Sequence, residues 1–330
     1  MTIYRTIFSL LVAASLTACG SQSELPSNAT EHAVQGAYDA SLSDDGSLSL
    51  VSSVSHGLAL WDLNKNGLKY QWSHQQVEDN LVLSTDISFD NSAAVSADKE
   101  NFALWDINSG ENIGFWKIKD SSIRDISVSN QGRHVLYGKS NGVVVHIDMQ
   151  TGRRIEFLGH QEKINAVDMS PNGYYALTGS NDYAAFLWDT RTAQVIHRFN
   201  HPSRVTQVTL DPKGRYAFTA DSQKQARIWD LQTGQMISNL QFTSRQQIFS
   251  AARFNADGSL LLTGSPTRKI ALWDAKTGQQ LQTWHVTPRK ESRPQSAVVY
   301  DVAFKADGHT IISESSSGLA ETWQIEKKNE

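Results

Sequence analysis

The sequence is poor in the residues that build disulfide scaffolds and in the long apolar runs that cross membranes. One cysteine among 330 residues excludes a disulfide framework and a zinc site made of several cysteines. Hydrophobic residues make up 39% of the chain, and the mean hydropathy is -0.39, which excludes a disordered chain and a polytopic membrane protein. The net charge is only -4, so the chain is not a polycation and we expect no nucleic-acid partner.

Recognisable catalytic motifs are also absent. The sequence has no Gly-x-Ser-x-Gly elbow, phosphate-binding glycine-rich loop, His-Glu-x-x-His or EF-hand loop. Asp44 and Asp45 fall in a predicted turn, where capping of the backbone explains them. His197 and His201 are four residues apart, but their segment is predicted to be strand and loop, so they do not share a helix face. We therefore expect no enzyme activity, cofactor or metal, although perturbed carboxylates clustered at a channel mouth would favour an enzyme.

Residues 1–18 have the features of an export signal. Arg5 precedes an apolar run over residues 7–16, which is shorter than the roughly 20 residues that span a bilayer. The run leads into Leu16-Thr17-Ala18-Cys19, which contains the only cysteine. This motif resembles the lipobox of bacterial lipoproteins, which implies acylation of Cys19 and a membrane anchor. The alternative is an ordinary secretory signal followed by an unrelated cysteine.

The residues after the cysteine indicate a destination and a tether. Gly20 follows Cys19, and by resemblance to enteric lipoproteins the absence of Asp there implies the periplasmic face of the outer membrane. The rest of the segment 19–29 is polar and aperiodic, which is typical of a flexible tether.

The remainder of the chain is organised by a repeat. Trp-Asp ends an alternating apolar run five times, and Ile147-Asp148 and Trp323-Gln324 complete the series. Steps between successive copies are 44, 42, 41, 41, 44 and 50 residues. Turn signals containing glycine lie between the runs, so each unit is predicted to hold several short strands. The five Trp-Asp pairs are Trp61-Asp62, Trp105-Asp106, Trp188-Asp189, Trp229-Asp230 and Trp273-Asp274.

The repeat resembles the WD40 family over about residues 31–327. In that family a His, a Ser or Thr, an Asp and a Trp form a hydrogen-bonded structural tetrad, and only the fourth repeat supplies all four types. Gln223 and Thr267 replace the turn Asp in later repeats. The resemblance implies the tetrad His160, Thr178, Asp182 and Trp188.

A ring explains how such units become stable. A four-stranded blade cannot bury both of its faces alone, whereas radial stacking covers them. We therefore predict an all-β, seven-bladed propeller over residues 30–327, with residues 328–330 as a tail. The last repeat lacks an outer strand, so we expect residues near 30–34 to supply it and close the ring.

The tryptophans fit this architecture. Those of the Trp-Asp pairs share one repeat position, where packing between blades explains them better than a glycan-binding platform. Trp72, Trp116 and Trp284 fall near the fourth strand of their units, and we expect them to pack at the periphery.

Charge is distributed unevenly along the chain. Residues 201–300 hold 13 Lys and Arg against 6 Asp and Glu, a balance of +7, and sequence neighbours share a sector of a propeller. The link from His285 to Ser296 is long, and long loops on rigid scaffolds often carry binding. The candidate partner-binding residues are Arg204, Lys224, Arg245, Arg268, Lys269, Arg289, Lys290 and Arg293.

These features favour a non-enzymatic interaction module. We expect a monomeric, lipid-tethered scaffold that binds a protein with an acidic surface in the cell envelope. The alternatives are a small ligand or an anionic glycan or lipid head group at the loop face or in the central channel, and solvated loops of no binding function.

Overall fold

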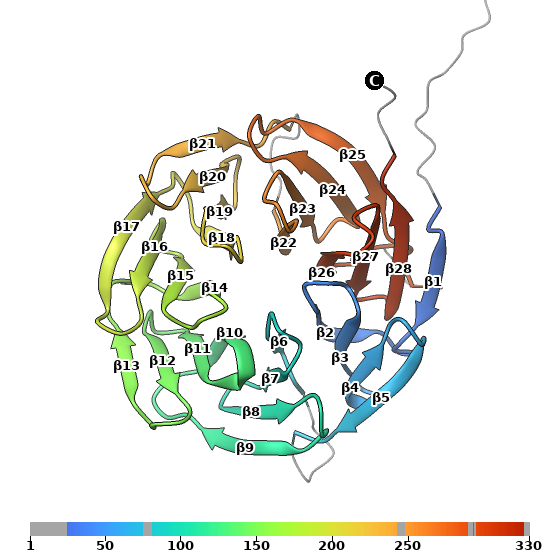
Figure 1. Ribbon diagram of the computed structural model, residues 1–330, viewed down its shortest axis with the longest axis horizontal. Coiled ribbons are helices and arrows are strands. Elements are labelled where there is room, and N and C mark those ends of the chain that lie inside the picture. Colours follow the sequence, from blue (N-terminus) through green and yellow to red (C-terminus); the bar gives the residue numbers. More distant parts are fainter. Residues whose placement is uncertain (1–24, 75–80, 243–247, 290–292, 294, 327–330) are drawn as a thin grey trace, which may run out of the picture.

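Seven four-stranded antiparallel sheets form a closed ring (Figure 1). The structure is a computed structural model that describes residues 25–74, 81–242, 248–289, 293 and 295–326. The predicted seven-bladed all-β propeller is confirmed. The helical content of these residues is a single 3-10 turn, η1 (Asn130–Gly132), so none of their helices has the length and hydropathy of a membrane span. The signal and Cys19 lie outside the described residues.

Each blade runs from an inner first strand to an outer fourth strand. Blade 1 comprises β2 (Ala37–Leu42), β3 (Leu48–Ser53), β4 (Gly57–Asp62) and β5 (Gly67–Trp72). Blade 2 comprises β6 (Ser84–Ile87), β7 (Ala93–Ala97), β8 (Asn101–Asp106) and β9 (Asn112–Lys117). Blade 3 comprises β10 (Ile123–Val128), β11 (His134–Lys139), β12 (Val144–Asp148) and β13 (Arg154–Phe157). Blade 4 comprises β14 (Ile164–Met169), β15 (Tyr175–Ser180), β16 (Ala184–Asp189) and β17 (Gln194–Asn200).

The remaining blades follow the same order. Blade 5 comprises β18 (Val205–Leu210), β19 (Tyr216–Asp221), β20 (Ala226–Asp230) and β21 (Met236–Asn239). Blade 6 comprises β22 (Ala251–Phe254), β23 (Leu260–Gly264), β24 (Lys269–Asp274) and β25 (Gln280–His285). Blade 7 comprises β26 (Val299–Phe304), β27 (Thr310–Ser315), β28 (Leu319–Gln324) and β1 (Asn28–Glu31).

The core lies between blades, where aromatic rings stack. Trp188 is fully buried, and its ring stacks on Phe157 of the preceding blade at 4.7 Å between centroids. Trp105 stacks in the same way on Trp72 at 4.8 Å. Trp72 and Trp284 lie in outer strands and pack there, as expected, and the next blade leaves them only 7% and 0% exposed. An outer strand is covered because the next blade lies against it.

The ring closes where the N-terminal strand joins the last blade. β1 pairs antiparallel with β28, with Thr30 opposite Ala320, as predicted. The strand starts at Asn28, inside the segment 19–29 that the sequence assigned to the tether. Just beyond β1, the buried His32 lies with Nδ1 2.6 Å from Oε1 of Glu314. Closure thus combines a strand ladder with a buried polar contact.

The antiparallel order gives the ring two different faces. The link face carries the links between blades and the turns between second and third strands. The turn face carries the turns between first and second and between third and fourth strands. β1 runs from the turn face to the link face, because it is antiparallel to β28 and leads into the link before β2. The chain from residue 25 therefore enters the ring at the rim of the turn face.

Candidate functional site

The tetrad residues of blade 4 meet on the link side of the blade. Nδ1 of His160 is 2.9 Å from Oδ2 of Asp182, and Nε2 is 2.9 Å from Oγ1 of Thr178. The side chain of His160 is buried, so both of its ring nitrogens are satisfied inside the protein. The fourth member departs from the pattern, because Nε1 of Trp188 has no hydrogen-bond partner. Its indole is held by stacking instead.

Blade 5 brings a similar set together, but without a hydrogen bond between its histidine and its aspartate. His201 and Trp229 both place a ring nitrogen 2.8 Å from Oγ1 of Thr219. Nδ1 of His201 lies 3.5 Å from Oδ2 of Asp221. The acidic residue stands two positions before Gln223, at the end of β19. The family motif expects the acidic residue in the turn between the second and third strands. Here the acidic residue is the last residue of the second strand, so the motif does not find it.

Part of the candidate basic set is exposed on the link face. Arg204 precedes β18 and Lys224 lies in the turn between β19 and β20; both side chains are exposed, and neither forms a salt bridge with the part of the chain that the structure describes. Arg289 and Arg293 are exposed in the long link before β26. Nη1 of Arg289 donates to the carbonyl of Gln35 at 2.7 Å, which joins this link to the closing segment. Arg245 and Lys290 lie outside the described residues.

Arg268 and Lys269 are not free surface cations. Nε of Arg268 donates to the carbonyl of Val286 at 2.8 Å, and its backbone N–H donates to Ala297 at 3.1 Å. Arg268 therefore holds both ends of the long link. Nζ of Lys269 donates to Oε1 of Gln280 at 2.8 Å, and burial lowers the pKa of this amine. Both side chains are half-buried, so the structure gives them positioning roles.

Exposed apolar side chains share the link face with these cations. Leu158 and Tyr183, around blade 4, are 71% and 54% exposed. A second group lies over blades 1 and 2. Its members are Val34, Val54, Leu81 and Leu83. Sequence reasoning missed them because single apolar residues in turns carry no periodic signal.

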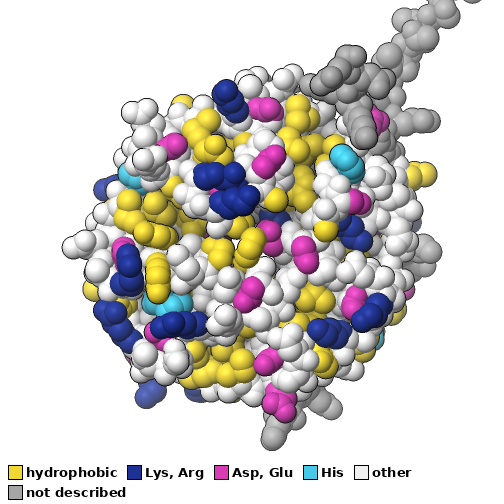
Figure 2. All heavy atoms as spheres, viewed as in Figure 1, with side chains coloured by type: hydrophobic (Ala, Val, Ile, Leu, Met, Phe, Trp, Pro, Cys, Tyr) yellow, Lys and Arg dark blue, Asp and Glu magenta, His cyan; other side chains and the backbone are white. Residues whose placement is uncertain are grey.

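The centre of the ring is a narrow, acidic channel. Its cavity of about 240 Å³ is lined by first-strand residues of the blades. Acidic side chains lie beside the centre of the ring in Figure 2. The carboxylates lining the cavity are Asp39, Asp44, Asp86, Asp125, Asp168 and Asp301. This cluster was not predicted, because the sequence does not show that first strands point these side chains at one axis.

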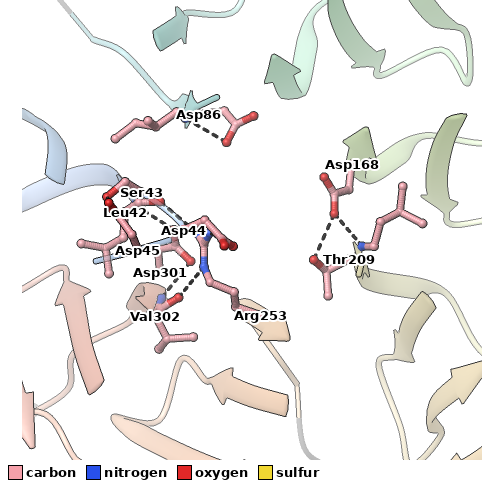
Figure 3. A network of polar contacts seen from close by, with 12 residues as sticks. Leu42, Ser43, Asp44, Asp45, Asp86, Asp168, Thr209, Arg253, Asp301 and Val302 are labelled. Carbon is pink, nitrogen blue, oxygen red and sulfur yellow. Dashed lines mark hydrogen bonds and ion pairs between the residues drawn. The ribbon is translucent and has the colours of Figure 1, made fainter. Parts of the chain in front are cut away.

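Most of these carboxylates connect neighbouring blades. Oδ1 of Asp86 accepts the N–H of Ile87 at 2.9 Å, and Oδ2 accepts the N–H of Val128 in the next blade at 2.8 Å. Asp168 accepts from Leu210 at 2.7 Å and from Thr209 at 3.0 Å in the same manner (Figure 3). A carboxylate suits this position because each of its oxygens can accept a backbone N–H.

Arg253 is the single cation that lines the channel among the described residues. It spans three blades: Nη2 donates to Asp301 at 2.7 Å and to the carbonyl of Leu42 at 3.0 Å, and Nε donates to Val302 at 2.8 Å (Figure 3). Nη1 donates to Asp44 at 3.3 Å. The guanidinium thus links blade 6 to blade 7 and to blade 1, next to the ring closure.

Burial of several channel carboxyl groups raises their pKa values. Burial raises the pKa of Asp86 to about 7, with a smaller contribution from the charge of Asp168. Burial likewise raises the pKa of Asp125 to about 6 and holds that of Asp39 well above its usual range. Burial alone would lower the pKa of Arg253, but Asp301 and Asp44 outweigh it and the pKa is raised.

The chemistry of the channel favours structure over ligand binding. A lining of carboxyl groups with a single arginine offers little positive charge to an anionic glycan or head group inside the channel. The perturbed carboxylates are the feature that would favour an enzyme, but those of Asp86, Asp125, Asp168 and Asp301 accept backbone N–H groups. No group of three His, Cys, Asp or Glu suited to a metal ion occurs within the described ranges.

Comparison with known families matches three segments of the chain. Residues 152–189, 193–230 and 236–274 match the family model described as WD domain, G-beta repeat. Each segment ends at the third strand of a blade and begins at or near the outer strand of the preceding one. No curated protein matches the chain. The chain is therefore a seven-bladed β-propeller that carries WD40 repeats.

Proposed function

We propose that this protein is a lipid-tethered, non-catalytic scaffold that binds an acidic protein partner through its link face. WD40 propellers generally mediate protein–protein interactions, which supports the general function. The observation that carries the specific proposal is the exposure of Arg204, Lys224 and Arg293 on one face, where Arg204 and Lys224 form no ion pair with any described residue. Cations that are not neutralised within the protein attract a negatively charged surface and accelerate encounter with it.

The tether orients this face. Lipidation at Cys19 is inferred from the sequence, and the chain is already fixed to blade 7 at Ser27, whose N–H donates to Thr322 at 2.7 Å. Ser27 follows Cys19 by eight positions, a reach of about 28 Å when fully extended. Because the chain enters at the rim of the turn face, that face lies nearer the membrane. The link face is then directed into the periplasm, away from the outer membrane.

A charge reversal with a matched control tests the proposal. The variant Arg204→Glu/Lys224→Glu changes two exposed cations on the link face. The control Lys213→Glu/Lys276→Glu makes the same change in charge at exposed positions on the turn face of blades 5 and 6. Partner capture is measured in cells with a photo-crosslinking residue at position 289.

The expected result is one specific protein captured by the wild type and by the control, and lost in the link-face variant. Equal capture by all three proteins would contradict the role of the basic residues. Reproducible capture of glycan or lipid without protein would favour the alternative, an anionic ligand at the link face.

A further inference from the structure

The turn between second and third strands contains a conformation that glycine usually supplies. Gly142 in blade 3 and Gly318 in blade 7 adopt φ angles of 87° and 81° there. Both lie ten residues after the positive-φ glycine of the preceding turn, Gly132 and Gly308. A residue with a side chain is strained in this left-handed region, whereas glycine is not.

Two blades place large residues at that position. Arg268 in blade 6 has φ 70°, and Tyr183 in blade 4 has φ 69°. The strain at Arg268 is explained by its side chain, whose Nε donates to the carbonyl of Val286 in the long link. A strained residue persists where its side chain has a role that glycine cannot fill.

The ring of Tyr183 has no such internal role. It is 54% exposed, and within the described residues it has no aromatic contact and its hydroxyl has no hydrogen bond. Its backbone carbonyl accepts the N–H of His201 at 2.8 Å, and its neighbour Asp182 is held by His160. The turn is therefore rigid while the side chain points into solvent.

The surroundings of Tyr183 combine apolar and charged character, with Leu158, Glu162 and Arg204 exposed in the adjoining links. Leu158, two residues before His160, is 71% exposed in the adjoining link. Arg204 follows three residues after His201 in the other adjoining link and is exposed. Hydrogen bonds of the Tyr183 turn to both links keep these segments together. Aromatic residues beside Arg are enriched among the few residues that dominate binding energy at protein interfaces.

We propose that Tyr183 is the aromatic anchor of a peptide-binding site over blades 4 and 5 of the link face. The ligand is a segment of a partner protein that carries an apolar side chain flanked by carboxylates. The apolar side chain contacts Tyr183 and Leu158, and the carboxylates face Arg204 and Lys224. This inference rests on the proposed function and names the ligand class and the central residue of that same face.

The test uses the full chain and three fluorescent peptides of 12 residues. One peptide has a central Leu flanked by Glu residues, one has Lys in place of Glu, and one has Ser in place of Leu. Affinity is measured by fluorescence anisotropy for the wild type, Tyr183→Gly and the control Tyr175→Ala, which removes a 39% exposed ring on the turn face. The Glu–Leu peptide should bind the wild type best, and Tyr183→Gly should weaken it at least about tenfold.

A second readout separates binding from folding. Glycine suits the conformation at position 183, so Tyr183→Gly should keep or raise the melting temperature while it loses affinity. Undetectable binding of the Glu–Leu peptide, or equal affinity for the three peptides, would overturn the inference. Binding of anionic phosphatidylglycerol vesicles in its place would also overturn it.

The two proposals fail differently. If Arg204→Glu/Lys224→Glu abolishes capture of the cellular partner while Tyr183→Gly leaves peptide affinity unchanged, the anchor is wrong and the basic face stands. If neither change affects partner capture or peptide affinity, both proposals are wrong.

Discussion

Single residues at the channel wall connect the blades. Arg253 donates to groups on blades 1 and 7, and its side chain is only 20% exposed. Asp301, which accepts from Arg253, also accepts the N–H groups of Val302 and Leu42 at 2.8 Å each. Loss of the guanidinium would leave two largely buried carboxylates, Asp301 and Asp44, without their cation.

The variant Arg253→Met tests this role. Removal of one partner from a largely buried ion pair leaves an uncompensated charge, and we expect the free energy of unfolding to fall by about 3 kcal/mol. Chemical denaturation measures the change. Arg204→Met removes an exposed cation and should change stability by less than about 0.5 kcal/mol. Equal effects of the two substitutions would contradict the structural role of Arg253.

The channel carboxylates predict a pH dependence with a definite sign. The folded protein retains the proton of Asp86 up to about pH 7, whereas an unfolded chain releases it near pH 4. The folded state thus binds more protons between these values, so this group lowers stability as pH rises from 4 to 7.

Asp86→Asn removes that titration. The loss of stability between pH 5 and pH 7 should shrink relative to the wild type, by up to about 1.4 kcal/mol per pH unit. Denaturation at several pH values measures the slope. Asp257→Asn serves as the control, because hydrogen bonds from Ser259 hold the pKa of Asp257 below its ordinary value, outside this range. An unchanged slope for Asp86→Asn would show that the carboxyl is ionised throughout.

Sequence alone could not divide the cations into exposed and positioning groups. Arg204 and Arg268 both fall in predicted loops of one basic sector. Only the fold shows that Arg268 reaches the carbonyl of Val286, which lies 18 residues away. Sequence spacing predicts which element a residue occupies, but the direction of a long side chain depends on the neighbouring segment.

At the scale of elements, the closing strand β1 lies before the first sequence repeat and completes the last blade. β1 completes blade 7 from the opposite end of the chain, and His32 beyond it contacts Glu314. The ring of His32 also stacks on Trp61 of blade 1 at 4.4 Å. The closing segment therefore fixes the first blade to the last.

Deletion of residues 25–33 removes this closure. We expect the melting temperature to fall by roughly 5–10 °C, because about 2–3 kcal/mol of pairing and burial are lost in a large domain. Calorimetry measures the change, and size-exclusion chromatography should show self-association through the exposed edge of β28. Val34→Ser, at a 61% exposed position next to the deletion, is the control. An unchanged melting temperature in the deletion variant would contradict closure by β1.

The blades were predictable because their signal repeats. Each Trp-Asp or weaker copy marks a third strand, so seven copies give seven sheets even where Ile147 replaces Trp. The partial set in blade 5 was not predictable, because Asp221 ends β19 instead of standing in the turn. Packing of Trp284 was expected from its place in a fourth strand, and its complete burial reflects cover by the next blade.

At the scale of the whole molecule, the proposed tether distinguishes a face of the ring near the membrane from a face directed away from it. The proposed lipidation at Cys19 would place the turn face toward the membrane and the link face away from it. Cys19→Ala should move the protein from the membrane fraction to the soluble periplasmic fraction, with an unchanged melting temperature. Cell fractionation checks the distribution, and retention of the variant in the membrane fraction would contradict the lipid anchor.

The most direct test of the account compares the two faces in living cells. A photo-crosslinking residue replaces Gln223 on the link face or Lys213 on the turn face, both exposed in blade 5. We predict that position 223 captures one specific envelope protein and that position 213 does not. Capture of the same protein from both positions, or of no protein from position 223, would contradict a scaffold that binds through its link face.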